Sequence, residues 1–95
     1  MGSYVIRLKV LPEDTTVDLD ALARSVSSSL PTGAHVRNQR VEPIAFGLSA
    51  VMLDVIAPEE EGAIESVEKS VSATKLVGQC EVVGVSRMSS RLPPQ

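Results

Sequence analysis

Two kinds of hydrophobic spacing alternate along the chain. Residues 4–11 are apolar at every second position, which is typical of a strand with one buried face. Apolar residues then recur at intervals of three and four, which predicts a helix. Asp18 can cap its first turn, and Pro31 and Gly33 end it near Leu30. The buried stripe of this helix consists of Leu19, Leu22, Ala23, Val26 and Leu30.

The second half of the chain repeats this order of elements. Residues 34–41 carry several charges, which is typical of an edge strand because charge discourages pairing with other chains. Residues 48–57 and residues 79–87 are mostly apolar and predict two further strands. Between them, Glu59-Glu60-Glu61 places negative charge at the start of a second helix, where the helix dipole favours it. The buried stripe of that helix consists of Ile64, Val67 and Val71, and Thr74 is a candidate to continue it.

This order of strands and helices predicts an α+β fold. Strand, helix, strand, strand, helix, strand with right-handed crossovers gives the ferredoxin-like arrangement, a four-stranded antiparallel sheet with two helices on one face. We expect one domain at residues 1–88 and a mobile tail at residues 89–95. The other face of the sheet is then open and apolar enough to mark a partner surface. The alternation places on it Val5, Arg7, Lys9, Leu48, Ala50 and Met52.

The composition narrows the possible partners. A chain of 95 residues with 43% hydrophobic residues can form one core without disulfides or a metal. The only aromatic residues are Tyr4 and Phe46, and the net charge is −3, so we expect no direct contact with nucleic acid. No apolar run approaches the ~20 residues that a membrane span requires. We therefore expect a soluble, cytoplasmic protein without a membrane partner.

Residue types that carry catalysis or bind metals are scarce. Cys80 is the only cysteine, which excludes an intrachain disulfide and a zinc site built from cysteines. His35 is the only histidine, and no nucleophile-elbow motif is present. The glycines are scattered, so the chain has no glycine-rich phosphate loop. We expect no catalytic residue, no metal and no cofactor, and a protein that acts by binding.

The segment between the two middle strands has an unusual composition for a loop. Pro43 favours extended backbone before it, and Gly47 can supply a positive φ. Ile44, Ala45 and Phe46 are apolar, although a loop in so small a domain normally lies on the surface. Phe46 therefore has two interpretations. It is either a core residue folded inward or a ring that is offered to a partner.

Several motifs together indicate a family. They are Val10-Leu11-Pro12-Glu13, Val17-Asp18-Leu19-Asp20-Ala21-Leu22, Leu30-Pro31-Thr32-Gly33-Ala34, Glu42-Pro43-Ile44-Ala45-Phe46-Gly47-Leu48 and Glu81-Val82-Val83-Gly84-Val85. With these motifs, residues 4–87 resemble archaeal translation elongation factor 1-beta, the guanine-nucleotide exchange factor for elongation factor 1-alpha. The resemblance implies a ferredoxin-like fold, which agrees with the fold predicted from the pattern.

The resemblance also implies a mechanism without covalent chemistry. In such a family the aromatic residue of the Phe-Gly turn inserts into the nucleotide-binding domain of the partner GTPase. Contacts near the phosphates and the magnesium ion then loosen bound GDP. Carried over to this chain, Phe46 is the inserted ring, Gly47 lets the backbone turn behind it, and Pro43, Ile44 and Ala45 contact the partner beside it.

The carboxyl end of the chain departs from the pattern of eukaryotic relatives. Those relatives use a lysine at the extreme carboxyl terminus to disturb the magnesium site, whereas this chain ends Arg87-Met88-Ser89-Ser90-Arg91-Leu92-Pro93-Pro94-Gln95. Arg87 either supplies a cation beside Phe46 or is an ordinary residue at a strand end. The alternative function is a non-catalytic ferredoxin-like module. Such a module would oligomerise through its open sheet face or bind a small ligand there, and the chain itself could self-associate weakly.

Overall fold

The computed structural model describes residues 2–89 of the chain. Their elements follow the predicted order: β1 (Gly2–Pro12), α1 (Leu19–Ser29), β2 (His35–Ala45), β3 (Leu48–Pro58), α2 (Ala63–Ser72) and β4 (Val77–Ser89). Of the tail expected at residues 89–95, Ser89 is the last residue of β4 and the other residues lie outside the described part.

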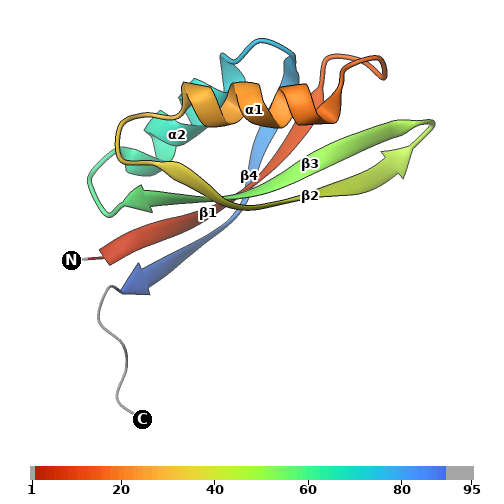
Figure 1. The fold of residues 1–95 in the computed structure, drawn as a ribbon. Helices are drawn as coiled ribbons and strands as arrows, with labels where there is room; N and C mark the ends of the chain where they lie inside the picture. The colour runs from red at the N-terminus through yellow and green to blue at the C-terminus, as the bar shows by residue number, and fades with distance from the viewer. Residues whose placement is uncertain (1, 90–95) are drawn as a thin grey trace.

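The strands form one antiparallel sheet in the order β2-β3-β1-β4. Both helices lie on the same face of this sheet, and the other face is open (Figure 1). This arrangement confirms the ferredoxin-like α+β fold. It also confirms that β2 is an edge strand, since β3 is its only partner in the sheet.

The core lies between the sheet and the helices. Cross-strand pairs place Ile6 opposite Val55, Leu8 opposite Leu53 and Val10 opposite Val51, and all of these side chains are buried. The predicted alternation of β1 and β3 is therefore correct on the helix-covered face. The core cluster consists of Ile6, Leu8, Val10, Leu22, Val26, Val51, Leu53, Val55, Ala57, Val67 and Val71.

The two helices begin in different ways. The carboxylate of Asp18 accepts a hydrogen bond from the backbone N–H of Asp20 at 3.0 Å, so the predicted cap of α1 is confirmed. The residue that precedes α2 is Gly62, which has a φ of 79° and no side chain to cap the helix. The three glutamates at residues 59–61 therefore precede the helix, and Glu65 is the acidic residue in its first turn.

The β2–β3 hairpin extends beyond the rest of the sheet. The pairing of β1 with β3 ends at Val10 and Val51, whereas β2 and β3 continue to pair up to Ala45 and Leu48. Residues 42–50 thus form a two-stranded projection, here called the hairpin arm, visible as the free green end in Figure 1. The predicted strand at residues 34–41 was too short, because backbone pairing with β3 keeps the next four residues extended.

Candidate partner-binding site

The tip of the hairpin arm is a two-residue turn. Ala45 pairs with Leu48, and Phe46 and Gly47 connect them with φ values of 54° and 79°. Two-residue turns of the type I′ class need a positive φ at both central residues, because only then does the turn match the twist of the strands. The bend was expected to depend on Gly47 alone. The structure shows that Phe46 itself adopts the left-handed conformation.

Phe46 is exposed on a strained backbone. Its relative exposure is 102%, so no part of the described chain covers the ring, and the core interpretation is wrong. A left-handed conformation costs a residue with a side chain about 1–2 kcal/mol. Neither burial nor backbone preference explains a phenylalanine here. Strain at an exposed position is instead typical of residues that are placed for function.

Apolar side chains continue from the tip along β2. Ile44 is 43% exposed and Val41 is 54% exposed, on the edge strand beside the turn. Pro43 lies at a shift in the β2–β3 register and provides no N–H to the free edge. Proline on an edge strand discourages a further strand from pairing there. The hairpin arm therefore presents side chains to a partner, and less readily its backbone edge.

Arg87 lies at the opposite end of the sheet from Phe46. Tyr4 of β1 pairs with both Arg87 and Ala57, and Ala57 is nine residues along β3 from Leu48. At ~3.3 Å per residue this places Arg87 about 30 Å from the turn. An Arg87 side chain beside Phe46, which was one interpretation of the sequence, is therefore wrong. A contact of Arg87 with the same partner stays a prediction for a second point on the molecule.

Arg87 has an intramolecular partner that the sequence did not indicate. Its Nη2 lies 2.6 Å from Oε2 of Glu59, in the connection between β3 and α2. The backbone N–H of Glu59 also donates to the carbonyl oxygen of Gly2 at 3.2 Å. Three segments that are distant in sequence thus meet at this end of the sheet. No local motif indicates the ion pair, because it depends on the register of β4 against β1.

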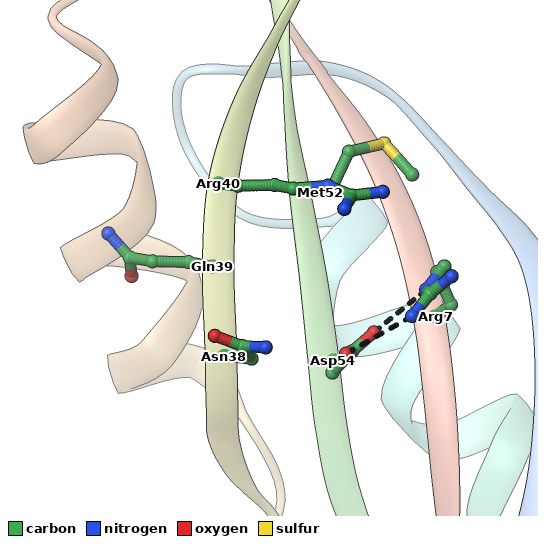
Figure 2. A pocket seen from close by; sticks show the side chains of 6 residues that line it. All are labelled: Arg7, Asn38, Gln39, Arg40, Met52 and Asp54. Atoms are coloured by element: carbon green, nitrogen blue, oxygen red, sulfur yellow. Dashed lines mark hydrogen bonds and ion pairs between the residues drawn. The ribbon is translucent and has the colours of Figure 1, made fainter.

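The open sheet face is more polar than expected. At its centre Arg7 forms a bidentate pair with Asp54, with distances of 3.0 Å from Nε to Oδ1 and 3.4 Å from Nη2 to Oδ2 (Figure 2). Ala50, which was expected to contribute to an apolar surface, is completely buried, and Met52 is half-buried. Arg40 extends across β3 beside Met52 (Figure 2). The apolar partner surface predicted for this face is therefore absent from its centre.

Charges surround Asp54 on this face. The hydrogen bond from Arg7 lowers the pKa of Asp54 most, and the positive charges of Arg7, Arg40 and Arg37 lower it further. Burial acts in the opposite direction and raises it. The carboxylate is therefore ionised at neutral pH, and it is paired with Arg7 while the charges of Arg37 and Arg40 act on it from further away. Neither Arg37 nor Arg40 forms an ion pair within the described residues.

Reactive side chains do not converge within residues 2–89. Burial raises the pKa of the Cys80 thiol, which disfavours the nucleophilic thiolate. His35 is exposed at the start of the edge strand β2. The described residues contain no group of three or more His, Cys, Asp or Glu side chains placed to hold a metal ion. Neither described helix is long and apolar enough to cross a membrane.

Comparisons with known proteins agree with the resemblance seen in the sequence. The elongation factor 1-beta of Staphylothermus marinus is 41% identical over 90 residues, which cover 94% of this chain and all of that protein. The elongation factor 1-beta of Methanothermobacter thermautotrophicus is 39% identical over 88 residues, 93% of this chain and 99% of that protein.

A solved structure shares the fold alone. The C-terminal domain of the MgtC protein from Mycobacterium tuberculosis has a TM-score of 0.50 at 13% identity, over 95% of this chain and 88% of that one. The model of the EF-1 guanine nucleotide exchange domain matches residues 5–88, which include both helices, β2, β3 and most of β1 and β4. The chain therefore belongs to the family of EF-1 guanine nucleotide exchange domains.

Proposed function

We propose that this chain promotes the release of GDP from elongation factor 1-alpha during translation elongation. The observation that carries the proposal is Phe46, a fully exposed ring on a left-handed turn at the tip of a projecting arm. Membership of the exchange-domain family and the named relatives support the same function. The protein acts by binding, without a covalent step.

Exchange follows from a difference in affinity. A protein that binds the nucleotide-free GTPase more tightly than the GDP-bound GTPase must weaken GDP binding by the same factor. Equal affinity for both states would change nothing, however tight the complex. Phe46 must therefore bury more of its ring in the nucleotide-free partner. Full burial of a phenylalanine side chain is worth about 1.5–3 kcal/mol, which is enough for a substantial shift.

The hairpin arm is suited to insertion. The pairing of β1 with β3 ends at Val10, and beyond this point β2 and β3 pair only with each other. The tip of the arm can therefore enter a crevice that would not admit the four-stranded body. The turn also fixes the backbone of Phe46 before binding, which reduces the entropy lost in the complex. Ile44 and Val41 extend the apolar contact along one strand. Arg87, at the other end of the sheet, would reach a different part of the same partner.

The rate of GDP release tests this function. Elongation factor 1-alpha from the same organism is loaded with fluorescent GDP, and release is followed by stopped flow with and without the chain. We expect the wild type to accelerate release and Phe46→Ala to lose most of the acceleration. Val85→Ala is the matched control, since Val85 is a 45% exposed apolar residue on β4. The proposal is wrong if folded Phe46→Ala releases GDP as fast as the wild type.

A further inference from the structure

The open sheet face carries a small hollow above β3. Its volume is about 40 Å³, enough for one small polar group, and Met52 is the apolar residue in its lining. Figure 2 shows Arg7, Asn38, Arg40 and Asp54 around it, whereas the side chain of Gln39 points away towards α1. The polar side chains come from three neighbouring strands, because Asn38 pairs with Asp54 and Asp54 pairs with Arg7.

The donors around this hollow are positioned in different ways. Arg7 is held by both oxygens of Asp54 and keeps its remaining N–H groups available, since 52% of its side chain is exposed. Arg40 approaches from the edge strand across Met52 (Figure 2). A guanidinium group presents a planar set of donors that matches the two oxygens of a carboxylate. The pairing with Asp54 prevents Arg7 from turning away.

The local charge is opposite in sign to that of the whole chain. The chain has a net charge of −3, yet Asp54 is surrounded by the charges of Arg7, Arg37 and Arg40. One carboxylate neutralises one of these three guanidinium groups. Glu42 lies further out on the hairpin arm, opposite Ala50. The hollow therefore has an excess of positive charge on a sheet face that no described residue covers.

We propose that this hollow binds a glutamate or aspartate side chain of an acidic segment in a partner protein. The carboxylate would lie over Met52 and accept hydrogen bonds from Arg40 and from the free N–H groups of Arg7, with Asn38 at the rim. Arg37 extends the positive charge along β2, so that a second acidic residue of the same segment can be accommodated. The site is independent of the exchange activity proposed above.

Two other occupants fit this surface less well. Nucleic acid binding depends on many phosphate contacts and, for single strands, on aromatic stacking, whereas two arginines line the hollow and the nearest residues include no aromatic ring. A second copy would have to offer an exposed acidic surface, such as the helix side where Glu61 and Glu65 lie. That contact joins two different surfaces of one chain and would not close into a dimer.

The experiment is a titration followed by nuclear magnetic resonance. The ¹⁵N-labelled chain is titrated with the peptide acetyl-(Glu-Ala)₃-amide, and separately with an oligothymidylate of six nucleotides. We expect the peptide to shift the amides of Arg7, Asn38, Arg40 and Met52, and high salt to reverse the shifts. The oligothymidylate should leave these amides unchanged.

Charge variants identify the site. Arg40→Gln should lower the affinity for the peptide about three- to fivefold, as expected for the loss of one exposed ion pair. Arg37→Gln should have a smaller effect in the same direction, and Arg40→Lys should restore part of the affinity. Arg24→Gln is the matched control, because Arg24 is an exposed arginine on α1. Arg40 is itself exposed on an edge strand, so its replacement leaves the core intact.

Each other outcome overturns the proposal. Equal weakening by Arg24→Gln would mean that the peptide is attracted by general charge only. Tighter binding of the oligothymidylate at Arg40 would assign the face to nucleic acid. Concentration-dependent shifts at Arg40 without peptide would assign it to self-association. Phe46→Ala should bind the peptide like the wild type, so the failure of this proposal and the failure of the exchange function can be distinguished.

Discussion

The two ends of the sheet differ in how their side chains are used. At one end, Phe46 makes no intramolecular contact that covers its ring, and its backbone is strained. At the other end, Arg87 is paired with Glu59, whose backbone N–H is bonded to Gly2. The features of the second end connect segments of the fold to each other. The exposed ring at the first end makes no such connection, which is the strongest reason to assign it to a partner.

The distance between the ends provides the first way to test this comparison. We expect Phe46→Ala and Arg87→Gln to change the rate of GDP release independently, because residues about 30 Å apart share no contacts. Phe46→Ala should have the larger effect, about tenfold or more if it is a hot spot of the interface. The measurement is a double-mutant cycle on the rate of GDP release.

The double variant decides between two arrangements. If the double variant slows GDP release by the product of the two single effects, the two residues make separate contacts with the partner. A double variant no slower than Phe46→Ala alone would mean that both residues act at one place on the partner, against the geometry of the sheet. Glu59→Gln serves as the control at the second end, since it frees the Arg87 side chain without removing its charge.

Much of the fold could be predicted because the relevant signals are local. Asp18 lies next to the amides that it caps, and the alternation of β3 requires only that Leu53 faces the helices. The limits of the hairpin could not be predicted in this way. Pro43 is a loop signal by itself, but cross-strand pairing with Ser49 places it inside a strand. Long-range pairing therefore overrides a local preference.

The candidate site was only half predictable for the same reason. Phe46 could be found because an apolar ring between Pro43 and Gly47 is anomalous wherever the strands lie. The hollow on the open face depends on Arg7 and Asp54 being opposite each other, a fact of strand register. The β1–β4 pair also shifts register between Arg7 and Leu8, which no local pattern reveals.

The conformation of the turn gives a second test. Gly47 has a φ of 79° and open space where a Cβ would lie, so Gly47→Ala should cost about 1–2 kcal/mol of unfolding free energy from backbone strain alone. Gly84 is the matched control, because its φ is not in the left-handed region and an added Cβ would lie 3.9 Å from Arg7. Urea unfolding measures both variants. Equal stabilities would contradict the strained turn.

The pair of Arg7 and Asp54, which lies in the middle of the sheet between the two ends, can be tested by measuring stability as a function of pH. The folded-state pKa of Asp54 is lowered, so its pairing stabilises the fold above the unfolded pKa of about 3.9 and this contribution is lost as the pH falls through the lower folded value. The difference in stability between the wild type and Asp54→Asn should therefore be constant above about pH 5 and shrink at lower pH.

Two further comparisons show whether the pH dependence of stability comes from the pair of Arg7 and Asp54. The pKa of Asp14 is also lowered, by hydrogen bonds from Thr16. Its contribution to the pH dependence is the same in the wild type and in Asp54→Asn, so it cancels in the difference between their stabilities. With Arg7→Gln as the background, the Asp54→Asn difference should depend much less on pH, since the hydrogen bond from Arg7 is the main cause of the shift. An unchanged pH dependence there would show that Arg37 and Arg40 are sufficient.

The smallest expected effect is that of Phe46→Ala on the stability of the fold, although the same change should have the largest effect on GDP release. Phe46→Ala should change the unfolding free energy by less than about 0.5 kcal/mol, because the ring is fully exposed and both residues share the same backbone strain. Leu53→Ala, in the same hairpin but completely buried, should cost about 2–5 kcal/mol. Urea unfolding of both variants measures this contrast. A loss of more than about 1 kcal/mol for Phe46→Ala would reveal an intramolecular contact of the ring, and the tip would then belong to the fold like the Arg87 end.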